Sequence, residues 1–141
     1  MNTYFKLMII GLAILTGLNL GACAGVPTQG ELLHHNFVLT EVNGVVFTGE
    51  KIPNIQFNEG LKVSGAICNN YMGQGELVGD KLFVKELAST KMLCFDQNLN
   101  ELEFAFGNML MNGATVNYSG NELMLSGDGY RLKFKLQDFV D

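Results

Sequence analysis

The sequence predicts a mainly β domain, a small and strongly curved antiparallel sheet or barrel with one packed α-helix. Three observations support this α+β class. Apolar and polar residues alternate with a period of two through most of the chain. Turn sequences rich in Gly and Asn separate these alternating runs. One segment after residue 96 instead repeats its apolar residues at helical spacing.

The first half of the domain reads as a series of short strands, over residues 37–42, 55–57, 61–67, 73–78 and 81–84. Turn sequences such as Asn-Gly, Asn-Glu-Gly and Gly-Asp lie between them. Glycines inside these strands indicate bends or bulges, which a small sheet needs when it curls. We therefore expect hairpins rather than crossover connections.

A helix is predicted between Asp96, which can cap its start, and Gly113, which ends it. Its apolar side chains share one face, which we interpret as core rather than as a cofactor site. This face consists of Leu99, Leu102, Phe106, Met109 and Leu110. The helix is expected to close one side or end of the sheet. After it, residues 114–137 have the pattern of a three-stranded meander.

The N-terminal residues have the pattern of a bacterial lipoprotein signal. Lys6 precedes an apolar run over residues 7–15, which is shorter than the about 20 residues that a spanning helix needs. Leu20-Gly21-Ala22-Cys23 then places a cysteine after two small residues. In proteins with this signature the cysteine sulfur receives a diacylglycerol and the signal is removed. An ordinary secretory signal and a buried core helix are the alternatives.

This pattern divides the chain into three parts. Residues 1–22 are predicted to be the signal peptide, residues 23–31 the lipidated N-terminus and a tether, and residues 32–141 the domain. Ala24, rather than Asp, follows Cys23, and by resemblance to Gram-negative sorting rules this favours the outer membrane. The expected location is the cell envelope, on the outer membrane and facing the periplasm.

The charge of the chain limits its partners. It carries 9 basic and 14 acidic residues, a formal net charge of −5. An acidic chain without a basic stripe excludes nucleic acid as a partner. It also argues against electrostatic attachment to anionic lipid. Membrane attachment is therefore expected through the lipid on Cys23, where two or more acyl chains hold stably and one does not.

Lipidation of Cys23 leaves two cysteines, Cys68 and Cys94. In the periplasm such a pair is expected to be oxidised. The closed loop of about 27 residues would stabilise the fold by roughly 3–4 kcal/mol. Two free buried thiols, or a redox or metal pair, are the alternatives. Neither cysteine lies in a Cys-x-x-Cys arrangement, and no further His or Cys flanks them.

No catalytic, metal or cofactor motif is evident. His34 and His35 are adjacent, and on an extended segment they point to opposite sides, so they do not easily share one metal. Glu101 and Glu103 lie two apart on the predicted helix and do not face each other. The chain has no phosphate-binding loop and no metalloprotease motif. We expect no cofactor, no metal and no enzymatic activity.

Two motifs end at or surround Cys68 and Cys94. A Ser- and Gly-rich strand leads to Cys68-Asn69-Asn70-Tyr71-Met72-Gly73, and Ala88-Ser89-Thr90-Lys91-Met92-Leu93-Cys94 follows. In these motifs the chain resembles the META domain family, in particular its HslJ-like heat-shock lipoproteins. The matching positions are Cys68, Asn69, Tyr71 and Gly73, and then Ala88, Thr90, Lys91, Met92 and Cys94. Ser89 replaces the usual Thr.

The resemblance covers residues 32–137 and includes the helix. It implies a β-rich barrel or curved sheet with one helix and a stress-associated role in the envelope. It brings no catalytic residue, because the family is not known for an enzymatic activity. We expect Asn69 and Thr90 to hydrogen-bond neighbouring backbone, and Tyr71 and Met92 to pack beneath the helix, since buried polar groups need partners. A polar patch that faces a ligand is the alternative role for the motif.

Two functions are consistent with these observations. The first is a lipid-anchored, non-enzymatic domain that supports the envelope and the integrity of the outer membrane under heat or chemical stress. The second is a binding module in the periplasm, whose barrel accepts a small apolar ligand or which binds another envelope protein. A core filled by Phe106, Leu132 and Phe134 would argue against a ligand inside the barrel.

Overall fold

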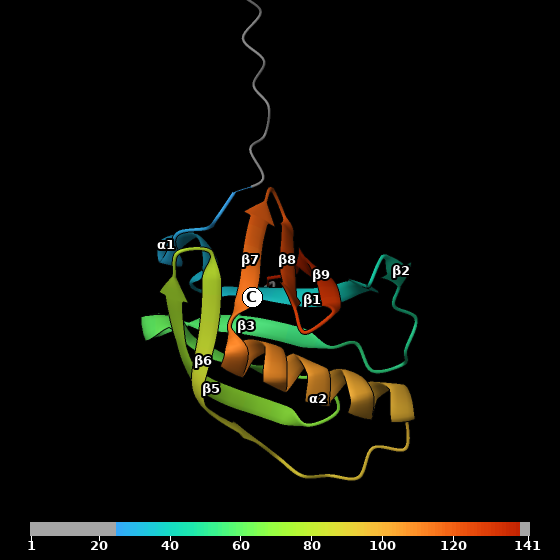
Figure 1. Ribbon diagram of the computed structural model, residues 1–141. Helices are drawn as coiled ribbons and strands as arrows, with labels where there is room; N and C mark the ends of the chain where they lie inside the picture. Colours follow the sequence, from blue (N-terminus) through green and yellow to red (C-terminus); the bar gives the residue numbers. More distant parts are fainter. Residues whose placement is uncertain (1–24, 139–141) are drawn as a thin grey trace, which may run out of the picture.

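The structure is a computed structural model that describes residues 25–138. Within these residues, eight antiparallel strands close into a barrel and a long helix lies against it (Figure 1). A short additional strand pairs with the end of the first barrel strand. The strands are β1 (His35–Val42), β2 (Val45–Val46), β3 (Asn54–Asn58), β4 (Lys62–Ala66), β5 (Asn70–Val78), β6 (Lys81–Ser89), β7 (Ala114–Ser119), β8 (Glu122–Gly127) and β9 (Tyr130–Leu136). The helices are α1 (Gln29–Leu32), the 3-10 turn η1 (Glu59–Leu61) and α2 (Gln97–Asn112).

The barrel follows the chain order and closes between its first and last strands. The strand order is β2-β1-β3-β4-β5-β6-β7-β8-β9, and an antiparallel pairing of β1 with β9 joins the two ends. Phe37 lies opposite Leu136 in this pairing, and Val42 lies opposite Leu132. The predicted mainly β class with a curved antiparallel sheet is therefore confirmed as a barrel.

One seam of the barrel is joined by very few residues. Strand β6 pairs with β5 from one end to the other, but it pairs with β7 only at Lys81–Thr115 and Leu82–Ala114. Beyond these pairs, helix α2 lies beside β6 in place of a strand (Figure 1). The two elements approach closely at Gly107, where a side-chain carbon would lie 3.7 Å from Leu87. The helix thus completes the wall of the barrel along β6.

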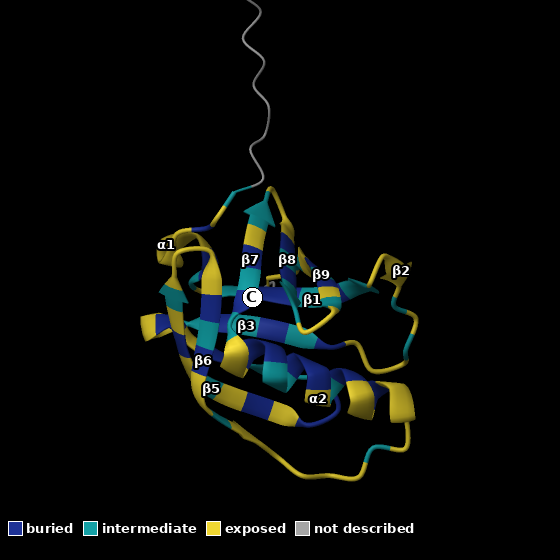
Figure 2. Ribbon diagram, in the orientation of Figure 1, coloured by how far each residue is buried: buried dark blue, intermediate teal, exposed yellow. Residues whose placement is uncertain are grey.

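Large apolar side chains fill the interior of the barrel. Phe106, Leu132 and Phe134 are fully buried. The buried side of α2 and of the eight barrel strands faces inward (Figure 2). The rings of Phe106 and Phe134 have their centroids 6.3 Å apart. Burial of such side chains contributes most of the free energy that stabilises a domain of this size. Because these side chains occupy the interior, the structure argues against an apolar ligand inside the barrel.

Helix α2 matches the helix predicted from the sequence. It begins after Asp96, whose carboxylate accepts the main-chain N–H groups of Asn98 at 2.9 Å and Leu99 at 3.3 Å. Gly113 follows its last residue. All five apolar residues of the predicted inner face are buried. The cap and the apolar spacing therefore fix both the limits of the helix and the side that it turns to the core.

The segment before β1 differs from the prediction. The sequence predicts a tether over residues 23–31, but its described part packs on the barrel. Gly25 exchanges two main-chain hydrogen bonds with Tyr118, at 3.0 and 3.4 Å, and α1 buries Leu32 completely. The Glu31 carboxylate accepts the main-chain N–H of Thr28 at 2.7 Å and its hydroxyl at 2.8 Å. This Thr-x-x-Glu capping pattern favours a helix start over a flexible linker, and its hydrogen bonds lower the pKa of Glu31.

Strands β5 and β6 are longer than the sequence predicts. Irregularities hide their continuation, because a bulge interrupts their pairing between Met72 and Gln74, and Glu86 adopts a positive φ of 53°. Each irregularity breaks the period-two alternation on which the prediction depends. As a result, both cysteine-containing motifs reach onto paired strands.

Candidate functional site

The two cysteines lie together where a turn meets a loop. Cys68 lies in the turn between β4 and β5, and Cys94 lies in the loop between β6 and α2. The structure pairs them as a disulfide with Cα atoms 6.1 Å apart, a separation within the range that disulfides adopt. Cys68 is buried and Cys94 half-buried. The pair ties the segment that leads into α2 to the edge of the barrel.

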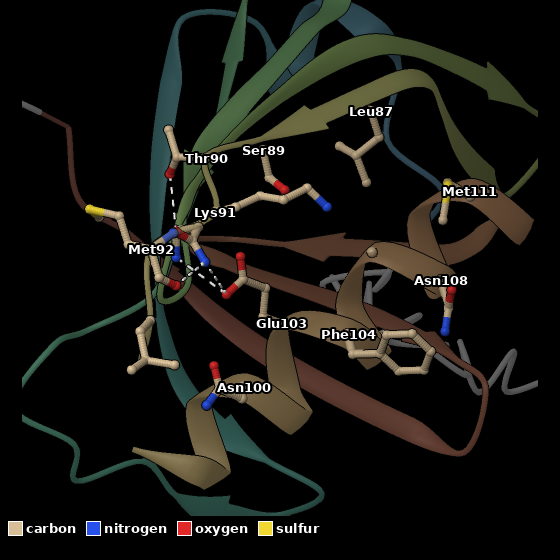
Figure 3. A pocket seen from close by; sticks show the side chains of 13 residues that line it. Leu87, Ser89, Thr90, Lys91, Met92, Asn100, Glu103, Phe104, Asn108 and Met111 are labelled. Atoms are coloured by element: carbon tan, nitrogen blue, oxygen red, sulfur yellow. Dashed lines mark hydrogen bonds between the residues drawn. The ribbon is translucent and has the colours of Figure 1, made fainter. Parts of the chain in front are cut away.

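Asn69, next to Cys68, is the centre of the polar network. Its side-chain oxygen accepts the main-chain N–H of Met92 at 2.6 Å and the hydroxyl of Thr90 at 3.2 Å. Its side-chain nitrogen donates to the Met92 carbonyl at 3.3 Å and to the Glu103 carboxylate at 3.2 Å. The amide is 8% exposed, so its hydrogen bonds replace those it would make with water. One side chain therefore joins the β6–α2 loop to helix α2, and the bonds around Met92 and Glu103 are drawn in Figure 3.

Thr90 and Tyr71 fasten the start of β5. The hydroxyl of Thr90 accepts the main-chain N–H of Asn70 at 3.1 Å, and the Thr90 N–H donates to the Asn70 carbonyl at 2.9 Å. Tyr71 is buried, and its phenol donates to the carbonyl of Asn54 at 2.8 Å. Its ring packs beneath α2, 5.3 Å from the ring of Phe106. Burial raises the pKa of Tyr71 well above its usual value. The expected positions of these residues agree with the structure.

Gly73 allows β5 to lie against β6. A side-chain carbon at Gly73 would collide with a methyl group of Val84 and lie 2.9 Å from the carbonyl oxygen of Lys85. Gly65 has the same role beneath Tyr71, where an added carbon would lie 2.6 Å from the phenolic oxygen. Both glycines permit a close approach that any larger residue would prevent.

The expectation that Met92 packs beneath the helix is wrong. Its side chain is 59% exposed, and only its main chain is held, by Asn69. The reason is that Met92 follows the end of β6 in an irregular segment, where alternation no longer sets the direction of a side chain. Met92 and its neighbour Lys91 instead border an open groove (Figure 3).

This groove, here called the β6–α2 groove, has a volume of about 600 Å³. One wall is formed by residues 87 and 89–93 of β6 and the following loop, and the other by residues of α2 between 100 and 111. Of the predicted site residues, Asn69, Thr90, Lys91 and Met92 line it. Tyr71 and Gly73 do not, because they face the core and strand β6.

Exposed apolar side chains surround the β6–α2 groove. Phe104 on α2 is 74% exposed and Leu93 in the loop is 82% exposed. We define the apolar rim as these two residues together with Met92 and Met111, which are also exposed and line the groove. Clusters of exposed apolar residues commonly mark interaction sites. The helical part of the rim was missed by the sequence reasoning. The sequence feature that could have identified it is the spacing of Phe104 and Met111. These residues lie seven residues apart and outside the buried face of the helix.

One group of possible metal ligands is found among residues 25–138, and its members are already engaged. The sulfurs of Cys68 and Cys94 lie with the Glu103 carboxylate within 4.8 Å, but the sulfurs are bonded to each other and Glu103 accepts from Asn69. His35 contacts the Asp138 carboxylate at 2.8 Å rather than sharing a ligand with His34. These groups are therefore engaged by the disulfide and by hydrogen bonds within the protein.

The predicted lipidation site lies outside the described residues. Cys23 and the predicted signal peptide belong to residues 1–24, which the structure does not describe. Neither α1, η1 nor α2 is both long and apolar enough to cross a membrane.

Comparison with known proteins identifies relatives across most of the chain. The family model of the META domain matches residues 30–139. Heat shock protein HslJ of Escherichia coli (strain K12) is 40% identical over 115 residues, which are 81% of this chain and 82% of that protein. A protein of known NMR structure, 39% identical, superposes with a TM-score of 0.74 over 82% of this chain and 99% of its own. Another, from Burkholderia xenovorans, has the same fold at 18% identity, with a TM-score of 0.63 over 97% of this chain and 99% of its own.

Proposed function

The chain belongs to the META domain family, and from this membership we propose that it is a lipid-anchored envelope protein with a non-enzymatic role. In this proposal it supports tolerance of heat and other stress and the integrity of the outer membrane. The observation that carries the proposal is the 40% identity to a heat shock protein over 81% of the chain. The likeness extends through the barrel and α2, so it supports a stress-related role for the domain as a whole.

The anchor is proposed from the sequence before the domain. Leu20-Gly21-Ala22-Cys23 has the lipoprotein pattern, and Gly25, two residues after the proposed lipid, is hydrogen-bonded to Tyr118. A lipid on Cys23 would therefore hold this end of the barrel close to the membrane surface. The acidic charge of the chain does not favour binding to anionic lipid by itself, which makes the acyl chains the source of attachment.

The role is proposed to be non-enzymatic because the best-defined polar groups serve the fold. Asn69, Thr90 and Glu103 bond to one another or to main chain across the β6–α2 junction. The disulfide between Cys68 and Cys94 lies at the same junction and suits an oxidising compartment. Polar groups that bond to one another in such a network stabilise the fold. In this proposal, binding involves the exposed surface beside them.

The test is deletion of the gene in the source bacterium, followed by challenge with heat and with a bulky antibiotic. The deletion strain should lose survival and admit the antibiotic more readily, and the wild-type gene should restore both. Cys23→Ser should fail to restore them and should leave the protein without acyl chains in intact-mass spectrometry. Ala24→Ser is the matched control, because it keeps the lipidated cysteine.

The outcomes separate the parts of the proposal. Unchanged survival and permeability after deletion would argue against the stress role. Full restoration by Cys23→Ser would argue against the anchor. Ala24→Asp should keep the lipid but move the protein to the inner membrane on density gradients, and its presence in the outer membrane would contradict the proposed sorting.

A further inference from the structure

Three side chains that can ligate a metal ion meet where the β6–α2 loop joins the barrel. The sulfurs of Cys68 and Cys94 and a carboxylate oxygen of Glu103 all lie within 4.8 Å of one another. Cys68 lies in the turn before β5, Cys94 in the loop after β6, and Glu103 on α2. Folding alone brings these three residues together, because they are far apart in the sequence and have no short spacing such as Cys-x-x-Cys.

The carboxylate of Glu103 is held in place without an ion pair. It is half-buried, and its Oε2 atom accepts the main-chain N–H of Asn69 at 3.3 Å and the side-chain N–H of the same residue at 3.2 Å. The ion pairs found in residues 25–138 involve other acidic groups, namely Glu41, Glu76 and Asp138. Hydrogen bonds to a carboxylate are the contacts that orient it in metal sites. Glu103 therefore places an oriented negative charge beside the two sulfurs.

The types and the spacing of these ligands suit Zn²⁺. Thiolates and carboxylates both bind Zn²⁺ in tetrahedral sites, and water takes the fourth position where the protein supplies three ligands. Two sulfurs that each lie about 2.3 Å from a tetrahedral ion are about 3.8 Å apart. Reduced Cys68 and Cys94 reach this separation by side-chain rotation, because their Cα atoms lie 6.1 Å apart. Glu103 points from α2 toward the β6–α2 loop (Figure 3) and lines the groove, from which water can enter.

We propose that this cluster is a redox-controlled zinc site, in which Cys68, Cys94 and Glu103 bind Zn²⁺ once the disulfide is reduced. The reductant is a dithiol. Its thiolate attacks the sulfur of Cys94, which is half-buried, rather than that of Cys68, which is buried. The attack releases Cys68, and the second thiol of the reductant then displaces Cys94 from the mixed disulfide. The reductant leaves as a disulfide, having given two electrons and two protons to the cysteines. Both cysteines release these protons when they bind Zn²⁺ as thiolates.

The two states hold the same loop by different bonds. In the oxidised chain the disulfide ties the β6–α2 loop to the turn before β5. In the reduced chain Zn²⁺ replaces this tie and adds α2 to it through Glu103. Because the folded chain holds the three ligands together and the unfolded chain does not, Zn²⁺ stabilises the reduced domain. This inference goes beyond the stress role and the lipid anchor, and it rests on the disulfide and the position of Glu103.

The test is a titration of the purified protein with Zn²⁺ in competition with a chromophoric chelator. The protein is reduced with a dithiol, which is then removed under nitrogen. Reduced wild type should bind one Zn²⁺, and the oxidised protein should bind about a hundredfold more weakly or not at all. Glu103→Gln should lower the affinity of the reduced protein about tenfold or more. Glu101→Gln is the matched control, because Glu101 is exposed on the same helix and lies outside the cluster. Cys23→Ser should bind like wild type, which separates the result from the lipid anchor.

Two further measurements report on the ligands and on the fold. Co²⁺ added to the reduced protein should give the visible bands of a tetrahedral site and a thiolate charge-transfer band, and Cys94→Ala should lose both. Zn²⁺ should raise the melting midpoint of the reduced protein, and it should restore the circular dichroism of any reduced protein that has unfolded. Four results would each overturn the proposal. They are no Zn²⁺ binding by reduced wild type, equal binding by the oxidised and reduced forms, equal affinity of Glu103→Gln and Glu101→Gln, and binding unchanged in Cys94→Ala.

Discussion

The main-chain N–H of Met92 donates to the side-chain oxygen of Asn69 across 2.6 Å, although 23 residues separate the two in sequence. The disulfide of Cys68 and Cys94 fixes the same loop two residues further on, and Asp96 then caps α2. The segment between β6 and α2 is therefore held at successive points, although it has no regular secondary structure. These attachments position the helix against the side of β6 that does not pair with β7 beyond Leu82.

Replacing Asn69 with Ala should destabilise the domain by about 2–3 kcal/mol, since it leaves the main chain of Met92 and the Glu103 carboxylate with fewer partners in a partly buried region. Urea unfolding followed by circular dichroism measures the change. Asn70→Ala is the matched control, because Asn70 is exposed and its main chain makes the observed bonds to Thr90. Equal stability of the two variants would show that the Asn69 network contributes little.

Replacing Gly73 with Ala should cost roughly 1–3 kcal/mol, because the added methyl group collides with Val84 and Lys85 of the neighbouring strand. The midpoint of thermal unfolding should fall, and amide exchange should accelerate in β5 and β6. Gly30→Ala serves as the control, since nothing lies within 4 Å of an added carbon there. A Gly73→Ala protein as stable as Gly30→Ala would contradict the close approach of β5 and β6.

Mass spectrometry of the unreduced protein should show one covalent link, between Cys68 and Cys94. Two thiols that can be alkylated without reduction would refute this expectation. Changing both cysteines to Ser should remove about 3–4 kcal/mol of stability by the chain-entropy model for a loop of this length. The sequence separation of the pair is 26 residues. Reduction of the wild-type protein should lower its stability by a similar amount, which separates the bond from the effect of the substitutions.

Stability should fall as the pH rises above about 10, the pKa of a tyrosine in an unfolded chain. Burial raises the pKa of Tyr71 in the folded state, so the unfolded chain loses this proton first and folding becomes less favourable. The loss continues until the pH exceeds the folded pKa. Tyr71→Phe should show a shallower decline in urea unfolding between about pH 9 and 11. Some decline should persist, because burial also raises the pKa of Tyr118. Parallel profiles for the wild type and Tyr71→Phe would rule out Tyr71 as the cause.

Regular patterns made much of the fold predictable. The alternation in Tyr130–Leu136 and the apolar face of α2 can be read from the sequence, because the buried positions of both elements carry apolar residues. The barrel closure was predicted only as an alternative to an open curved sheet. Pairing of β1 with β9 depends on the twist and bending of all the strands together. The residue pattern of any one strand therefore does not predict whether the barrel closes.

The candidate site was predictable in part for a similar reason. The motif residues Asn69 and Thr90 were identified through their resemblance to a family, and their hydrogen bonds agree with the expected contact with backbone. Met92 was misplaced because an irregular segment has no period that sets the direction of its side chains. The β6–α2 groove was not predicted, since it arises from the early end of the β6–β7 pairing and from residues of α2 that are exposed only in that setting.

The pairing of β1 with β9 also sets an order of events during synthesis. Phe37 pairs with Leu136, which is synthesised ninety-nine residues later. Until then the first strand has an unsatisfied edge, and contacts so distant in sequence form slowly. A nascent chain of this protein is therefore exposed to aggregation until its last strand emerges. Loss of β9 would leave β1 and β8 each with an open edge.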